Sequence, residues 1–160
     1  MDGMATALWM GLERSDRFVE VFTSNLRDED WRATPPGFPN CPLWVLGHLA
    51  FYRGHFLDLC LGGRTVEEGW RGLFSIGSAP PPPEALPSVD ACREELARRR
   101  EMWRGWLETV SDAALLEPRP ALAPYFENRA QLVVHLTHHE AHHTGGLSML
   151  SRLLGRGKIL

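Results

Sequence analysis

All seven histidines of this 160-residue chain lie in two short segments. Two of them are in residues 48–55, and the other five are in residues 135–143. Five histidines within nine residues are a poor choice for a purely structural helix, because an imidazole is only half apolar and titrates near neutral pH. Residues four apart on a helix stand one above the other. His139 and His143 can therefore direct two rings at a single ion.

A helical wheel over residues 128–154 indicates which of these histidines face inward. At about 100° per residue, His139 and His143 fall inside the apolar arc centred on Leu132. His138 and His142 lie to one side of that arc, so we expect them at its boundary or in solvent. An isolated HxxxH pair is weak evidence for a metal, because a lone core histidine is more often a hydrogen-bonded packing residue.

A divalent metal needs a third ligand, and the other histidines of the chain are His48 and His55. On the preceding helix His48 lies on the same stripe as several aromatic residues, so it is expected to face the same apolar interior. Metal sites in helical bundles are commonly built from side chains on facing helices. We therefore predict that His48, His139 and His143 bind one divalent transition metal. Zinc and nickel are the first choices, and iron and manganese are the alternatives.

Apolar residues at helical spacing predict the elements that position these side chains. Between the second and third helices lies a long connection with four consecutive prolines, Pro80 to Pro83, which favour an extended polyproline conformation. No segment alternates apolar and polar residues as a strand does. We expect an all-α four-helix bundle in up-down-down-up order, formed by residues 1–160 as a single domain, with the long connection crossing one end. The expected helices cover residues 6–26, Pro42–Leu61, 88–110 and 128–154.

Composition excludes several classes of function. A net charge of −3 and a pI near 6.2 give no basic surface for nucleic acid. No apolar run reaches the length of about 18 residues that a membrane span needs, and the first residues lack the order of a secretion signal. Three widely spaced cysteines without a CxxC pair fit a reducing compartment. We expect a cytoplasmic protein that does not bind membranes or nucleic acid, and a homodimer, since bundles of this size often pair.

Two segments, residues 43–50 around His48 and residues 135–145, resemble the DinB/YfiT-like metal-binding bundles. The second is similar to that family's signature, a histidine followed four residues later by paired histidines and then a glycine. The resemblance implies the same three ligands, which agrees with the wheel. It also implies relatives that include thiol-dependent S-transferases and isomerases, hydrolases, and many members without a known activity. One departure is Gly146, where the family often has Gln, so a polar side chain near the metal is missing.

Three nitrogen ligands leave at least one metal position open, which is typical of a catalytic site. The first hypothesis is therefore a metal-dependent enzyme acting on a small molecule, of hydrolase or thiol S-transferase type, with a low-molecular-weight thiol as a co-substrate. Candidate acids or bases are Glu140, Tyr52, His55 and Arg99. Three of these candidates also have a non-catalytic alternative. Glu140 could orient a ring or pair with an arginine, and His55 could be a packing residue. Arg99 could extend to the end of the bundle or to a neighbouring carboxylate. The second hypothesis is a non-catalytic, stress-associated bundle in which the metal only joins two helices.

Overall fold

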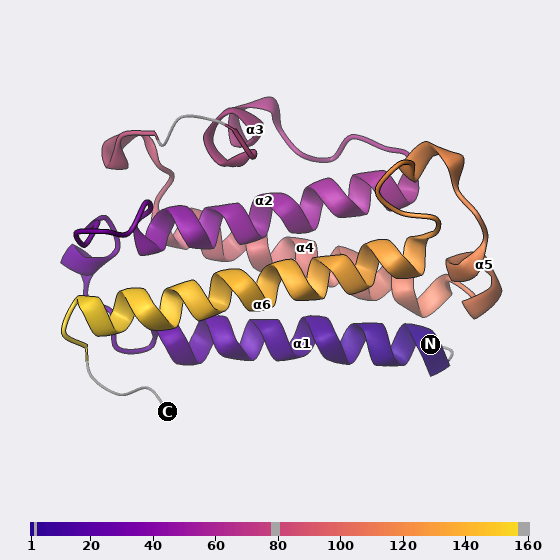
Figure 1. Ribbon diagram of the computed structural model, residues 1–160, viewed down its shortest axis with the longest axis horizontal. Helices are drawn as coiled ribbons and strands as arrows, with labels where there is room; N and C mark the ends of the chain where they lie inside the picture. The colour runs from indigo at the N-terminus through magenta and orange to yellow at the C-terminus, as the bar shows by residue number, and fades with distance from the viewer. Residues whose placement is uncertain (2, 78–80, 157–160) are drawn as a thin grey trace.

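The computed structural model describes residues 1, 3–77 and 81–156, and within that part the chain is all helical, without a strand. The predicted all-α class is confirmed, but six α-helices form rather than four, because two short helices lie in the connections (Figure 1). No helix in the described part is both long and apolar enough to cross a membrane. The α-helices are α1 (Gly3–Thr23), α2 (Pro42–Leu61), α3 (Glu68–Phe74), α4 (Val89–Thr109), α5 (Asp112–Leu116) and α6 (Arg129–Leu153), and the 3₁₀ turns are Asp28–Asp30, Pro83–Ala85 and Pro120–Leu122.

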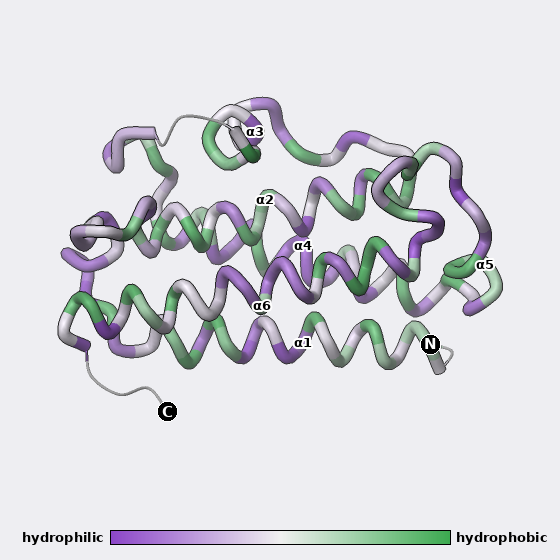
Figure 2. The backbone as a smooth tube through the Cα atoms, in the orientation of Figure 1, coloured by the Kyte–Doolittle hydropathy of each residue, from purple (hydrophilic) through white to green (hydrophobic). Residues whose placement is uncertain are grey.

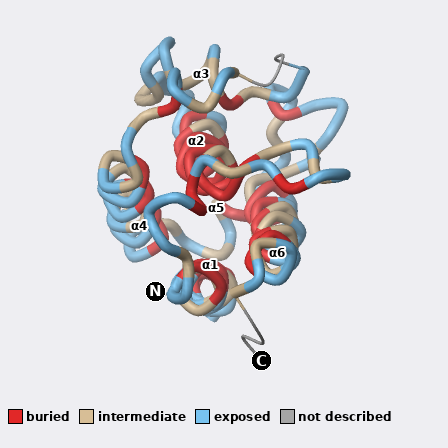
Figure 3. The backbone as a smooth tube through the Cα atoms, turned by 90° about the vertical axis from the view of Figure 1, so that its left-hand side faces the viewer, coloured by how far each residue is buried: buried red, intermediate tan, exposed pale blue. Residues whose placement is uncertain are grey.

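The four long helices lie side by side along the long axis of the molecule. In Figure 1, α1 and α6 run in one direction, and α2 and α4 run in the other. The most extensive packing is between α2 and α4 and between α1 and α6, and α2 also packs against α6. Hydrophobic positions recur along these helices between hydrophilic ones (Figure 2). Seen from the end, the buried residues of each helix face the others (Figure 3).

Helix α2 is the central element, since nearly every one of its residues is buried (Figure 3). This agrees with its apolar character all round. Cys41 occupies the N-cap position and Pro42 the first turn, where the missing N–H of proline costs nothing. Gly62 ends the helix in the left-handed conformation, at φ 74°, and its N–H donates to the carbonyl of Asp58 at 2.8 Å. Both ends lie where the sequence predicted them.

Side-chain caps fix the starts of α4 and α6. The hydroxyl of Ser88 accepts the N–H of Ala91 at 3.1 Å, and the side-chain oxygen of Asn128 accepts the N–H of Gln131 at 2.9 Å. Gly155, at φ 75°, follows the end of α6. These local signals placed the long helices of the second half to within one residue or so.

Helix α1 begins and ends earlier than predicted, at Gly3–Thr23 rather than 6–26. At its start the carboxylate of Asp112 accepts the N–H groups of Met4 and Ala5, at 3.2 and 3.4 Å. This cap comes from a residue far along the chain. At its end Leu26 lies in a turn but still packs against the core, so the apolar stripe extends past the helix.

The connection between α2 and α4 does not merely cross the end of the bundle. It runs back along α2, with α3 packed on that helix (Figure 1). Phe74, the last residue of α3, is fully buried. Pro82 is extended, at φ −59° and ψ 141°, but Pro83 begins a 3₁₀ turn closed by the N–H of Leu86, so the predicted polyproline run is shorter than expected. Pro80 lies outside the described residues.

Candidate metal centre

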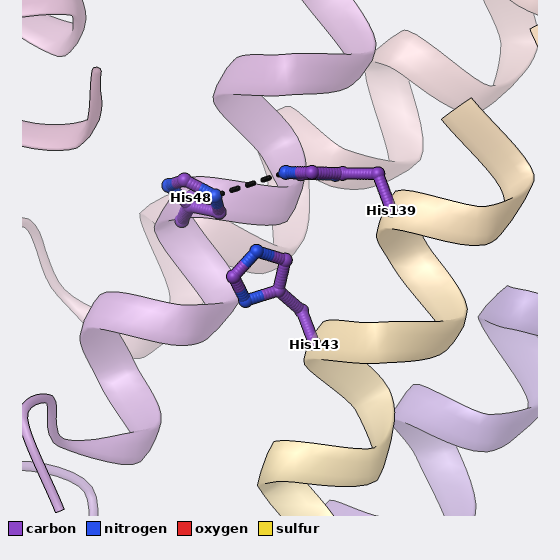
Figure 4. Close-up of side chains that lie close together, drawn as sticks. All are labelled: His48, His139 and His143. Atoms are coloured by element: carbon purple, nitrogen blue, oxygen red, sulfur yellow. Dashed lines mark hydrogen bonds between the residues drawn. The ribbon is translucent and has the colours of Figure 1, made fainter. Parts of the chain in front are cut away.

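Three imidazoles meet between α2 and α6 (Figure 4). His48 comes from α2, and His139 and His143 come from successive turns of α6. Nε2 of His48 lies 3.1 Å from Nε2 of His139. The ring centroid of His143 lies 4.4 Å from that of His48 and 4.5 Å from that of His139. One nitrogen of each ring lies within 4.8 Å of the other two, so the three rings share one region of space.

The backbone of α3 orients the His48 ring. Nδ1 of His48 lies 2.8 Å from the carbonyl oxygen of Phe74, so it carries the proton and donates. The neutral ring then has its lone pair on Nε2, which points toward His139. Metal-binding histidines almost always donate their other N–H to a carbonyl, carboxylate or water in this way. The carbonyl of Phe74 thus leaves Nε2 of His48 able to coordinate an ion.

Aromatic side chains of α2 form the walls on either side of His48. Trp44 stacks on the imidazole, with centroids 4.5 Å apart and planes at 25°. The ring of Tyr52 lies 4.6 Å from the rings of both His48 and His139. The indole N–H of Trp44 donates to the carbonyl of Leu73 at 3.1 Å. The hydroxyl of Tyr52 accepts the N–H of Ile76, also at 3.1 Å. Three turns of α2 therefore hold residues 73–76 over the centre.

The charge state and spacing of the rings fit a divalent ion. Burial lowers the pKa of His48 and of His143 to about 4, and burial together with the neighbouring imidazoles lowers that of His139 to about 3. All three rings are neutral at pH 7 and offer lone pairs. Two nitrogens bound tetrahedrally at about 2.0–2.1 Å stand roughly 3.3 Å apart, close to the 3.1 Å found here. Nδ1 of His139, on the other side of that ring, is buried without a hydrogen-bond partner.

The centre lies at the edge of the core rather than in a dry interior. His48 is buried, and His139 and His143 are half-buried, so the two rings of α6 converge on His48 from the border of the core. The wheel was centred on Leu132, whereas the buried face of α6 also includes Glu140 and Thr144. The nine buried residues of α6, taken together, are centred roughly 70° from Leu132 on the wheel. One side of the histidine group therefore faces solvent.

Of the four acid or base candidates, Tyr52 is the one whose ring packs against the site imidazoles in the described part of the chain. Glu140 follows His139 on α6 but points into the bundle, where Arg53 binds both of its oxygens at 2.6 and 2.9 Å. The alternative stated for Glu140, pairing with an arginine, is what the structure shows. Both of its oxygens therefore face Arg53 rather than the imidazoles.

His55 and Arg99 lie outside the histidine group. His55 stacks on Phe51, with centroids 5.8 Å apart and planes at 3°, which matches its packing alternative. Burial lowers its pKa. Arg99 is buried on α4, where its Nε donates to Glu95 at 2.7 Å and its Nη2 donates to the carbonyl of Thr65 at 2.8 Å. It therefore binds a nearby carboxylate, which is one of its two non-catalytic alternatives, although this carboxylate belongs to its own helix.

The remaining histidines of α6 are exposed, as expected for His138 and His142. Gly146 is half-buried, and a Cβ there would meet only Phe38, at an ordinary contact distance of 3.6 Å. A Cβ on Gly145 would meet nothing within 4 Å, so close packing does not require these glycines. Helix α6 runs through both of them without a break.

Sequence reasoning missed two residues next to the centre, Arg53 and Phe74. Arg53 carried a signal: it and Asp58 are the two charged residues of an otherwise apolar α2. A guanidinium on a helix buried all round must find carboxylates inside the protein. Phe74 carried no such signal, because its carbonyl, rather than its side chain, holds His48.

Comparison with known families gives one match. The sequence model of the DinB superfamily matches residues 12–147, a range that includes all three imidazoles. No curated protein matches the chain.

Proposed function

Because the chain belongs to the DinB superfamily and brings three neutral imidazoles together, we propose that it binds one divalent transition metal through His48, His139 and His143. In this proposal the ion serves a reaction on a small molecule, of hydrolase or thiol S-transferase type. The observation that carries the proposal is the convergence of the three rings, with Nε2 of His48 freed for coordination by the carbonyl of Phe74. Zinc or nickel fits nitrogen ligands best, and iron and manganese remain alternatives.

The accessible side of the centre supports a catalytic rather than a closed site. Three protein ligands leave a position for water or substrate, and two of the three rings are half-buried rather than fully enclosed. The bound ion would supply Lewis acidity, lowering the pKa of a water or a low-molecular-weight thiol held beside it. Substrates and thiols would reach it from the solvent side.

Residues of α2 would shape the reaction space. The hydroxyl of Tyr52 accepts the N–H of Ile76, which leaves its own proton free for a bound ligand. Burial raises the pKa of Tyr52, so the hydroxyl keeps this proton at neutral pH. The stacked ring of Trp44 shields the opposite face of His48 from water.

A second candidate function is a non-catalytic bundle in which the metal joins α2 to α6. The distribution of the ligands over these two helices favours it, because any bound ion would link them. The two functions differ in whether the fourth coordination position of the metal is open to an added ligand. In protein loaded with Co²⁺, added azide or a small thiol should change the visible absorption spectrum if that position is open, and should leave it unchanged if the ion is closed off.

The proposal also includes the finer organisation of the molecule. The directions of the long helices in Figure 1 support an up-down-down-up bundle. We further propose one domain over residues 1–160, a homodimer and a cytoplasmic location, with no nucleic-acid partner because the net charge is −3.

Metal analysis tests the proposal directly. Protein purified without a nickel column should contain one divalent ion per chain, or take up one when offered zinc, nickel or cobalt. His48→Ala and His139→Ala should lose the ion, because two imidazoles rarely hold a divalent metal. His138→Ala is the matched control, since this exposed histidine is on the same helix. A wild-type protein that stays empty, or equal loss in the control, would contradict the proposal.

A further inference from the structure

A buried ion-pair network lies at the centre of the bundle, around Arg53. Its Nε and Nη2 donate to the two oxygens of Glu140 at 2.6 and 2.9 Å, and its Nη1 lies 2.7 Å from Oδ1 of Asp16. Nη2 also donates to the carbonyl of Leu12 at 3.2 Å, and the indole of Trp103 donates to the carbonyl of Arg53 at 2.9 Å. One residue of α2 thus contacts α1, α4 and α6.

Burying charged groups this deeply carries a large desolvation cost, so the pair adds little net stability to the fold. The side chains of Arg53 and Glu140 are exposed to only 2% and 1%. Moving a charged group out of water costs several kcal/mol, and apolar residues of similar volume are often as stabilising as a buried pair. Burial alone would lower the pKa of Arg53, but the carboxylates of Glu140 and Asp16 outweigh it and raise that pKa. What the pair adds is geometry, because a two-pronged guanidinium–carboxylate contact has one orientation.

The pair lies immediately beside the histidine centre along both helices. Glu140 follows His139 and precedes His143 by three residues, and Arg53 follows His48 by five. A slip of α6 by one residue would turn its side chains by about 100° and move them by about 1.5 Å. Metal–ligand distances tolerate only about 0.2 Å. The rotation and height of α6 against α2 therefore decide whether the imidazoles converge.

We infer that Arg53 and Glu140 are a positioning pair for the metal centre: their two-pronged contact holds α6 against α2 at the one register in which His139 and His143 meet His48. The pair acts on the ion's affinity and coordination geometry without contributing a ligand. This inference rests on the proposed metal-binding function.

Cobalt titration of the metal-free full chain tests the inference, because the visible spectrum of Co²⁺ reports coordination geometry. In Glu140→Gln an NH2 group replaces one of the two accepting oxygens, so the two-pronged contact with Arg53 cannot form. We expect Co²⁺ affinity to fall by about 10–100-fold, the range found when partners of metal ligands are removed, and the absorption bands to change. Glu95→Gln is the matched control. It makes the same change at the partner of Arg99, the other buried arginine, on α4 and away from α6. Its affinity and spectrum should equal those of the wild type.

The outcomes separate the two ideas. A wild-type chain that takes up no Co²⁺ overturns the proposed function itself. A Glu140→Gln protein that is less stable but binds Co²⁺ with wild-type affinity and spectrum overturns the positioning role alone. If Glu140→Gln does not fold, Arg53→Lys keeps the charge but lacks the two-pronged geometry. An unchanged spectrum in that variant would likewise overturn the inference.

Discussion

Replacing Gly47 by alanine tests how α3 holds the proposed metal centre. Gly47 lies on α2 directly before His48, and a Cβ there would stand 2.2 Å from Cζ of Phe74 and 2.5 and 2.9 Å from its Cε atoms. The Phe74 ring is fully buried, and its nearest aromatic neighbour is Trp70, 5.2 Å away between centroids. It would have to retreat by about 1.2 Å to reach the 3.4 Å of an ordinary contact. Because the carbonyl of the same residue holds His48 at 2.8 Å, the retreat disturbs that hydrogen bond.

The expected cost of Gly47→Ala combines two opposing effects. Overpacking a filled core costs about 1–3 kcal/mol, while alanine gains about 1 kcal/mol over glycine in a helix interior. The net loss in the free energy of unfolding is therefore about 0–2 kcal/mol, which lowers Tm by up to about 8 °C in a domain of this size. Loss of the His48 hydrogen bond should weaken metal binding by about 10–100-fold.

Urea unfolding of the metal-free protein and Co²⁺ titration measure the two effects separately. Gly105→Ala is the matched control: this exposed position is inside α4, and a Cβ there meets nothing within 4 Å. The control should gain stability, by about 1 kcal/mol at most, and bind metal as the wild type does. A Gly47→Ala protein that is as stable as the control, with unchanged metal affinity, would refute the argument that Phe74 orients His48.

Two further predictions concern groups that burial shields. The pKa values of about 3 to about 4 for the site imidazoles lie below the 6.5 of the unfolded chain, so the unfolded state takes up protons first as the pH falls. The contribution of these rings to stability is therefore complete above about pH 6.5. Urea unfolding of the metal-free protein should show the free energy of unfolding decreasing from that pH toward pH 4. A free energy of unfolding that stays constant in that window would mean that the rings are not shielded. Burial also raises the pKa of the Cys60 and Cys92 thiols to about 12, so a thiol reagent at pH 8 should label them only after unfolding, and rapid labelling of the native protein would contradict their burial.

The long helices were predictable because their signals are local. Pro42 and Gly62 mark the ends of α2, and the Ser88 and Asn128 caps mark the starts of α4 and α6. The start of α1 was not predictable in this way, because its cap is Asp112, more than a hundred residues away. The short helices α3 and α5 were missed for a related reason: each has too few residues to show a helical period.

The histidine spacing was enough to select the three residues, but not their depth in the protein. A wheel centred on apolar residues gives no weight to polar ones, so Glu140 and Thr144 did not count toward the predicted core face. Both are 1% exposed. Arg53 makes the burial of Glu140 possible, and only the packing of α2 against α6 brings those two residues together. The core face of α6 predicted from the sequence was therefore displaced toward His139 and His143 from the face that is buried in the structure.

The two faces of α2 explain why this helix has to be apolar all round. His48 and Arg53 are five residues apart, so their side chains leave the helix about 140° apart. Arg53 points into the bundle and meets carboxylates of α1 and α6, while His48 lies under the connection that follows α2. Without α3 and Phe74, that outer face would be open to water, and Nδ1 of His48 would lose its acceptor. The proline-rich connection is thus part of the centre, since its first half forms a wall of the site that the imidazoles share.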